Sequence, residues 1–239
     1  SGLQLLGVDR PDELTAQQAL AAVGQSALMN TWGRAFQKQQ LHVGQVLLTR
    51  YDLEDRARYL NARACLVELF RLGVVPVVNE NDTVAVDELC FGDNDTLAAM
   101  VASMLDADLL VLLTDVEGLY SDLEQKTVIR EVASVDKTLF ALDFGKGDSV
   151  SRGGMATKLQ AARLATKAGI EVVLAHARAD EVLVRATDGQ EVGTRFIAQS
   201  KRLENRKRWL AYARVKRGTL TVNDRSEEHT SELQSRQSI

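Results

Sequence analysis

The sequence predicts an α/β fold in which helices cover a mostly parallel sheet, and three observations lead to this prediction. Short apolar runs alternate with amphipathic helical patterns between residues 43 and 114, in the order strand, helix, strand, helix, strand. The run DLLVLLT at 108–114 is apolar at almost every position, as in a strand buried on both faces of a parallel sheet. Gly73 and Gly169 each follow a helical pattern, at a position where Gly commonly ends a helix.

Regular elements can be assigned along most of the first half of the chain. Apolar side chains recur at helical spacing from Thr15 to about Gln40, but Gly24 and Gly33 interrupt the pattern, so one long helix and two shorter ones are both possible. The elements expected after it are a strand at 43–49, a helix at 53–72, a strand at 74–78, a helix at 96–105 and a strand at 108–114.

The second half contains shorter elements around a Gly-rich loop. Residues 145–154, GKGDSVSRGG, are predicted to form this loop, and a helix is predicted from Met155 to about Lys167. The other expected elements are a turn at 116–122, a strand at 128–132, a short helix at 137–144, a strand at 171–175, a short helix at 180–185 and an edge strand at 193–198.

The composition is that of an ordinary globular protein, with 239 residues, 45% of them apolar and 26% charged. A net charge of -4 gives no overall attraction for nucleic acid. Two cysteines, Cys65 and Cys90, are too few for a disulfide framework or a zinc site, which indicates a reducing compartment such as the cytoplasm. We expect no membrane partner, because no apolar run reaches the length of a bilayer span and no secretion signal is evident.

The C-terminal part has a different composition. Residues 201–217 are basic, with Trp209 and Tyr212 interleaved; such a run can contact RNA, but a solvated amphipathic segment is the interpretation we favour, so nucleic acid is not expected as a partner. Residues 225–239 almost lack apolar side chains, which predicts disorder. Their start, RSEEHTSELQS, resembles a translated sequencing adaptor, so we expect one domain at 1–224 and a non-native tail at 225–239.

A polar loop between Pro76 and Leu97 is the first candidate site. The apolar strand ends at Asn79-Glu80-Asn81-Asp82, and a second polar group, Gly92-Asp93-Asn94-Asp95, precedes a helix with Asp95 near its N-cap. Ligands of parallel sheets lie beyond the carboxyl ends of the strands, where this loop would be. Its carboxylates and carboxamides suit a small ligand with an ammonium and a carboxylate group. A surface loop with Asx turns is the alternative.

The segment from Ser151 to Lys158, SRGGMATK, is the second candidate site. Two glycines before a helix allow a ligand to approach the backbone closely, and the first N–H groups of the helix favour an anion. Thr157 could add a hydroxyl group and Lys158 a cation, so the segment suits a polyphosphate whose charge changes during phosphoryl transfer. The spacing is not that of a Walker motif, and a Gly-rich loop followed by an exposed Lys is the alternative.

The third candidate is Thr114-Asp115, at the end of the most apolar strand. A hydroxyl and a carboxylate group at this edge of the sheet could contact a nucleotide, although Asp115 could equally cap the following turn. The histidines are His42, His176 and His229; they have no carboxylate or Cys partners at ligand spacing, so we predict that they are not catalytic and expect no metal site built from protein ligands alone.

Five segments taken together resemble the amino acid kinase family, and within it the glutamate 5-kinases: VVPVVNEND, FGDNDTLAAM, LLTDVEGLY, GGMATKLQAA and LENRKRW. The resemblance extends over about residues 1–224. It implies a three-layer α/β/α sandwich around a mainly parallel sheet. It also implies transfer of the γ-phosphoryl group of ATP, with Mg²⁺, to the γ-carboxylate of L-glutamate, as the first step of proline biosynthesis.

The resemblance also assigns roles to individual residues. Asp82 and Asn94 would bind glutamate, Asp95 would hold the catalytic lysines, and Lys158 would stabilise the transferring phosphoryl group. Thr114 and Asp115 would contact the nucleotide. The residues implied to wrap its phosphates are Arg152, Gly153, Gly154, Met155, Ala156, Thr157 and Lys158.

The family pattern also contains parts that this chain does not show. A Gly-rich phosphate turn, a second Lys and a Ser-Gly-Ala substrate loop would lie upstream of Ser1, so we expect a sheet that lacks its first strands and a chain with little activity of its own. A C-terminal PUA domain, present in many members, is not complete here. The alternatives are another amino acid kinase, such as an acetylglutamate kinase, and a non-catalytic amino-acid-binding or sensing protein. The resemblance further implies a homo-oligomer and proline as a feedback inhibitor.

Overall fold

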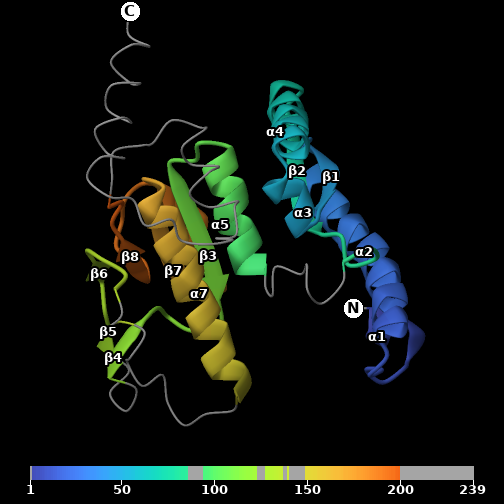
Figure 1. Ribbon diagram of the computed structural model, residues 1–239. Helices are drawn as coiled ribbons and strands as arrows, with labels where there is room; N and C mark the ends of the chain where they lie inside the picture. The colour runs from blue at the N-terminus through green and yellow to red at the C-terminus, as the bar shows by residue number, and fades with distance from the viewer. Residues whose placement is uncertain (1, 86–93, 123–126, 137–138, 140–148, 200–239) are drawn as a thin grey trace, which may run out of the picture.

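The computed structural model describes residues 2–85, 94–122, 127–136, 139 and 149–199, without the side chains of 149–153. The basic run at 201–217, the tail at 225–239, most of the short helix expected at 137–144 and the Gly92-Asp93 pair lie outside these residues. Within them, the chain alternates between helices and strands as predicted (Figure 1).

The first half forms a two-stranded parallel sheet with helices. Its elements are α1 (Gly2–Leu6), α2 (Leu14–Gln37), β1 (His42–Leu48), α3 (Arg50–Glu54), α4 (Arg56–Arg71) and β2 (Val74–Glu80). β1 and β2 pair in register from His42 opposite Val74 to Leu48 opposite Glu80. α2 is a single long helix despite its internal glycines, which answers the question that the sequence pattern left open.

The second half forms a four-stranded sheet with a small hairpin beside it. Its elements are α5 (Asn94–Met104), β3 (Leu109–Thr114), β4 (Tyr120–Asp122), β5 (Thr127–Val128), β6 (Glu131–Val132), α7 (Ser149–Lys167), β7 (Glu171–His176), α8 (Val182–Thr187) and β8 (Thr194–Phe196). The strand order of the larger sheet is β3-β7-β8-β6, while β4 and β5 form the antiparallel hairpin. β3 and β7 are parallel, β6 and β8 are parallel, and β8 runs antiparallel to β7.

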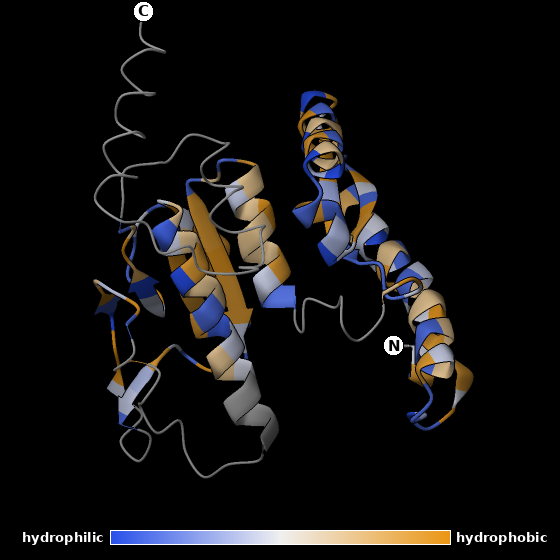
Figure 2. Ribbon diagram, viewed as in Figure 1, coloured by the Kyte–Doolittle hydropathy of each residue, from blue (hydrophilic) through white to orange (hydrophobic). Residues whose placement is uncertain are grey.

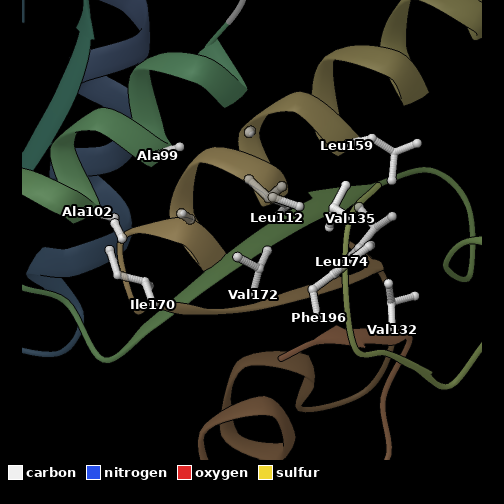
Figure 3. Close-up of a cluster of buried hydrophobic side chains, with 14 of the residues drawn as sticks. Ala99, Ala102, Leu112, Val132, Val135, Leu159, Ile170, Val172, Leu174 and Phe196 are labelled. Carbon is white, nitrogen blue, oxygen red and sulfur yellow. The ribbon is translucent and has the colours of Figure 1, made fainter. Parts of the chain in front are cut away.

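Helices cover both faces of the β3–β7 pair. On one face, α5 and α7 pack over Leu112, Val172 and Leu174 in the main hydrophobic core, which Figure 3 shows from the side. On the other face, Val173 and Ala175 pack against α8. Figure 2 shows the continuous apolar character of β3 between these layers. The expected α/β/α sandwich with mostly parallel pairing is therefore confirmed in this half.

α5 connects the two halves. Its buried residues Leu97 and Met104 share a second core with Leu48, Leu53 and residues of α4. Arg63 on α4 donates a hydrogen bond from Nε to the Met104 carbonyl at 3.0 Å. Within the described residues the two sheets are not hydrogen-bonded to each other, so one helix and its side chains hold them together.

Three predicted boundaries were wrong. The helix expected at 53–72 begins at Arg56, after the separate short helix α3. The strand expected at 128–132 is divided into β5 and β6, which pair with different partners. The helix expected to begin at Met155 begins at Ser149, so Gly153 and Gly154 lie inside α7 rather than in a loop before it. Gly lowers helix stability by about 1 kcal/mol relative to Ala, but the apolar stripe that packs the rest of α7 on the core outweighs this cost.

Candidate functional site

Four elements bring polar residues to one edge of the larger sheet. β3 and β7 are parallel and end together, with Thr114 opposite His176. α5 and α7 each precede one of these strands in the chain, so both helices start on the side where the strands end, and α7 begins beyond that edge (Figure 1). This is the edge at which parallel α/β sheets bind their ligands.

The alternation of side chains places Thr114 and His176 on the same face. Leu110 and Leu112 of β3 pack under α5 and α7, as do Val172 and Leu174 of β7. Successive side chains of a strand point to opposite faces, so residues two further along, Thr114 and His176, belong to the same face. Both therefore lie on the side of the sheet that α5 and α7 cover.

An ion pair joins the first turn of α5 to the middle of α7. Lys158 Nζ donates to Asp95 Oδ2 at 2.8 Å, across 63 positions of sequence. The two side chains are only 18% and 20% exposed, so water screens this pair less than it would a surface pair. The structure thus brings together the two residues expected to be catalytic, and Asp95 fixes the position of the Lys158 ammonium group.

Thr157 lies beside this ion pair. Its hydroxyl group donates to the Gly154 carbonyl at 2.9 Å, one turn earlier in α7. The same hydroxyl is 3.5 Å from Asp95 Oδ2, at the limit of hydrogen-bond distance. A Cβ atom added at Gly154 would meet no other atom within 4 Å, so the helix backbone faces open space there. A ligand could therefore approach α7 at its second turn.

The other residues expected around the phosphates differ in position. Met155 packs against the main core, and its backbone N–H lies inside α7 rather than among the free N–H groups at the start of the helix. Ala156 is exposed. Arg152 and Gly153 are in α7, but their side-chain positions lie outside the described part of the chain.

Thr114 and Asp115 follow the prediction for a strand end. Thr114 is half-buried and donates from its hydroxyl to Asp115 Oδ1 at 3.2 Å. Asp115 is exposed. Both side chains are therefore accessible at the edge that carries the ion pair, as contact with a nucleotide would require.

The polar loop after β2 forms a second region. Asn79 donates from Nδ2 to Gln25 Oε1 on α2 at 2.9 Å, and Thr83 donates from its hydroxyl to Asn81 Oδ1 at 2.6 Å. Asp82 lines a cavity of about 350 Å³ together with Arg10 and residues of α1 and α2. Neighbouring atoms displace water from its carboxyl group and raise the pKa of Asp82.

The structure does not place Asp82 and Asn94 in one cavity. Asn94, at the start of α5, lines a different groove of about 510 Å³ between α2, β2 and α5. The segment that separates them in sequence, 86–93, lies outside the described residues. Their joint binding of one ligand therefore stays a prediction.

A model of the amino acid kinase family matches residues 5–176, which is most of the chain. The chain belongs to the amino acid kinase family. Within its three-layer fold, the edge of the larger sheet described above carries Lys158, Asp95, Thr114 and Asp115.

Relatives within this kinase family are similar over nearly the whole chain. Glutamate 5-kinase of Herpetosiphon aurantiacus is 50% identical over 228 residues, covering 93% of this chain and 62% of that protein. Glutamate 5-kinase of Moorella thermoacetica is 48% identical over 228 residues, covering 93% of this chain and 60% of that protein. The chain thus spans about three fifths of the length of the curated relatives it matches.

Two solved kinase structures share the fold. The carbamate kinase from Giardia lamblia bound to AMP-PNP superposes with a TM-score of 0.53 at 18% identity, covering 75% of this chain and 72% of the other. The UMP kinase from Bacillus anthracis gives a TM-score of 0.51 at 13% identity, covering 83% and 74%. At these identities the likeness concerns the fold alone.

Two further observations concern metal ligands and membrane spans in the described residues. Within the described residues, no group of three His, Cys, Asp or Glu side chains gathers that could hold a metal ion. No helix in the described part of the chain is both long and apolar enough to cross a membrane.

Sequence reasoning missed two residues that the fold brings to these sites. His176 had no partner nearby in the sequence, and only the pairing of EVVLAH with LLVLLT places it beside Thr114. Gln25 lies within an apolar helical pattern, so nothing in the sequence indicated it as a site residue. In the structure it contacts Asn79 at the end of β2. Both were hidden because their partners are distant in the chain.

Proposed function

We propose that this chain is the kinase part of a glutamate 5-kinase, which transfers the γ-phosphoryl group of ATP to the γ-carboxylate of L-glutamate. The observation that carries the proposal is the Lys158–Asp95 ion pair at the ligand-binding edge of the sheet. Identities of 46–50% to glutamate 5-kinases over 93% of the chain support the choice of substrate.

The proposed reaction needs no nucleophile from the protein. A γ-carboxylate oxygen of glutamate bonds to the γ-phosphorus of ATP while the bond from that phosphorus to the β,γ-bridging oxygen breaks. ADP leaves, glutamyl 5-phosphate forms, and no proton is transferred. Such in-line transfer depends on positioning and on stabilisation of charge, which are the tasks that Asp and Lys side chains can perform.

Each site residue then has a defined role. Lys158 stabilises charge on the transferring phosphoryl group, and Asp95 holds Lys158 in position. Asp82 accepts from the ammonium group of glutamate, and Asn94 contacts the same substrate. Thr114 and Asp115 contact the nucleotide, and the segment 152–158 lies against its phosphates.

Mg²⁺ would neutralise charge on the phosphates of ATP. This ion usually keeps several waters and takes one or two carboxylates besides substrate phosphates. Asp95 and Asp115 supply carboxylates at this edge of the sheet, so the residues present fit such an ion held mainly by the nucleotide.

The proposal extends to location and partners. A cytoplasmic enzyme agrees with the free, exposed Cys65. Association of copies is supported by exposed apolar side chains on α4, namely Leu60, Val67 and Phe70. Inhibition by proline, the end product of the proposed pathway, completes the proposal.

A substrate panel with hydroxylamine tests the proposed activity. Hydroxylamine converts an acyl phosphate to a hydroxamate, which ferric chloride reveals. The protein translated from the full reading frame is incubated with Mg²⁺, ATP and one acceptor: L-glutamate, N-acetyl-L-glutamate, L-aspartate or UMP. We expect hydroxamate with L-glutamate, and ADP release that depends on L-glutamate.

Hydroxamate formed better from N-acetyl-L-glutamate or L-aspartate, or ADP release driven by UMP, would assign another activity within the family. Binding of L-glutamate without ADP release would favour an amino-acid-binding protein. The reaction with proline added, in amounts up to those of glutamate, tests the inhibition separately.

A further inference from the structure

We infer that His176 is a nucleotide-binding residue that donates a hydrogen bond from Nε2 to the nucleotide at the edge of the β3–β7 sheet. The inference rests on the proposed function, because it requires a nucleotide at this edge. It adds a contact from β7 to those expected from β3 and α7.

The fold fixes the position of His176 next to a predicted nucleotide contact. The residue is the last of β7 and stands opposite Thr114, the last residue of β3, in a parallel register. The backbone continues this pairing beyond the strand, because the Ala177 N–H donates to the Thr114 carbonyl at 2.7 Å. His176 and Thr114 therefore form a continuous row at the edge of the sheet.

The face on which His176 lies is that of the ion pair. Val172 and Leu174 pack under α5 and α7, and His176 continues this alternating set. The opposite set, Val173 and Ala175, packs under α8. His176 is therefore on the same side of the sheet as the first turn of α5 and the middle of α7, where Asp95 and Lys158 meet.

The hydrogen bonding of the ring leaves one donor available. The backbone N–H of Arg178 donates to His176 Nδ1 at 3.1 Å. A neutral imidazole that accepts at Nδ1 carries its proton on Nε2, so the ring presents an N–H donor there. In the described part of the chain Nε2 has no hydrogen-bond partner, and the half-buried ring is accessible.

A nucleotide offers acceptors that match this donor. Its ribose hydroxyls, base nitrogens and phosphate oxygens all accept hydrogen bonds. Asp82 and Asn94, the residues proposed to bind glutamate, lie after β2 and at the start of α5 rather than at β7. The Arg178 N–H also keeps the ring in one orientation before any ligand binds. Such preorganisation reduces the cost of ordering the side chain on binding.

Titration calorimetry of the protein from the full reading frame with AMP-PNP and Mg²⁺ tests this role without any need for catalysis. Three variants are compared with the unchanged chain: His176→Ala, His176→Gln and His42→Ala. His176→Ala removes the donor, and His176→Gln keeps an N–H donor near the position of Nε2. His42→Ala is the matched control, because His42 is an exposed histidine at the start of β1.

We expect His176→Ala to raise the Kd for AMP-PNP about two- to ten-fold, as loss of one hydrogen bond predicts. His176→Gln should stay within about two-fold of the unchanged chain, since it restores the donor. His42→Ala should bind as the unchanged chain does. Melting temperatures of the free variants should agree within about 2 °C, so that a change in Kd reports a lost contact.

Two results would overturn the inference: an unchanged Kd in His176→Ala, or a Kd for His176→Gln as high as that of His176→Ala. In either case the unchanged chain still binds AMP-PNP, so the proposed kinase function stands. Failure of the unchanged chain to bind AMP-PNP at all would instead contradict the nucleotide site itself, and His176 with it.

Discussion

Individual residues at the sheet edge are placed for charge stabilisation more than for stability of the fold. Lys158 and Asp95 are mostly buried and hold each other at 2.8 Å. Asp82, by contrast, is exposed and has no hydrogen bond within the described residues, and partial desolvation by neighbouring atoms raises its pKa. A mostly buried ion pair adds little to the free energy of unfolding once the desolvation of both charges is counted.

The first prediction concerns Lys158. Replacing it by Ala removes the cation expected to stabilise the transferring phosphoryl group, so kcat should fall about 10²–10³-fold. Lys158→Arg should recover only part of this loss, because a planar guanidinium does not replace an ammonium group. The measurement is the rate of hydroxamate formation by the protein from the full reading frame.

Lys167→Ala is the matched control, since Lys167 lies exposed at the other end of α7. It should retain the unchanged kcat. A Lys158→Ala variant that kept more than half of the rate would refute the role of this residue in transfer.

The second prediction concerns Asp82. The pKa of Asp82 is higher in the folded chain than in the unfolded chain, so folding favours the protonated carboxyl group. The stability that this difference gives is fully present below the unfolded pKa and is lost as pH rises through the folded pKa. Asp82→Asn should therefore leave the melting temperature at pH 7 unchanged or higher. The KM for glutamate should rise about 10–100-fold, as expected for a lost charge-assisted hydrogen bond.

Thermal unfolding at pH 4 and pH 7, together with KM for glutamate and for ATP, checks the effect of Asp82→Asn. The KM for ATP serves as the internal control and should not change. A variant that unfolded at a lower temperature at pH 7, with KM for glutamate unaltered, would show that Asp82 has a structural role instead.

Secondary-structure elements in this chain are set by local chemistry at their ends and by packing in between. Thr49 and Asp52 form a capping box at the start of α3, in which each side chain accepts from the backbone N–H of the other residue. Burial of Asp52 works against its ionisation, but hydrogen bonds from Thr49 and Arg58 outweigh it and lower the pKa of Asp52. α7 shows the opposite case, because core packing extends it through two glycines.

The third prediction compares two glycines in turns of the second half. Gly189 and Gly193 both have positive φ, of 73° and 61°. A Cβ atom at Gly193 would lie 2.0 Å from the Leu174 carbonyl oxygen, whereas one at Gly189 would meet nothing within 4 Å. The two sites thus share the conformational cost of an L residue but differ in close contact with β7.

Gly189→Ala should destabilise the chain by about 1–2 kcal/mol, the cost of a left-handed residue with a side chain. Gly193→Ala should cost more than this, because β8 must also move away from β7. Urea unfolding of both variants gives the comparison. Equal losses would mean that the approach of β8 to β7 contributes nothing at this position.

On the scale of the whole molecule, two sheets meet through one helix, α5. Leu97 and Met104 join it to the first sheet, and Ala99 and Ala102 join it to the second. The start of the same helix carries Asn94 and Asp95, which are expected to contact glutamate and the catalytic Lys. The proposed glutamate and nucleotide regions are thus connected through the element that holds the fold together.

Much of this arrangement was predictable from the sequence, since it depends on local patterns. The apolar run at 108–114 places β3 within one residue, and the helical spacing at 53–72 places α4 within three. Other features depend on contacts between distant segments. The antiparallel β8, the start of α7 at Ser149 and the position of His176 beside Thr114 all follow from tertiary packing, which no local pattern reports.

The same distinction between local patterns and contacts of distant segments applies to the candidate site. Residue types and spacing indicated Asp95, Thr114 and Lys158, and the fold brings Asp95 and Lys158 into contact and Thr114 to the same edge. Asp82 and Asn94 looked like one site because both belong to polar loops, yet they line separate hollows in the described structure. Their common ligand has to be tested by experiment.

Oxygen transfer from labelled glutamate tests the central claim most directly. The protein from the full reading frame is given ATP, Mg²⁺ and L-glutamate with ¹⁸O in both γ-carboxylate oxygens, and the product is trapped with hydroxylamine. Hydroxylamine attacks the acyl carbon, so phosphate leaves with the bridging oxygen. If the γ-carboxylate attacks ATP, each inorganic phosphate released will carry one ¹⁸O atom. Phosphate without ¹⁸O, released at the same rate as ADP, would mean that water takes the phosphoryl group and would contradict the proposed kinase reaction.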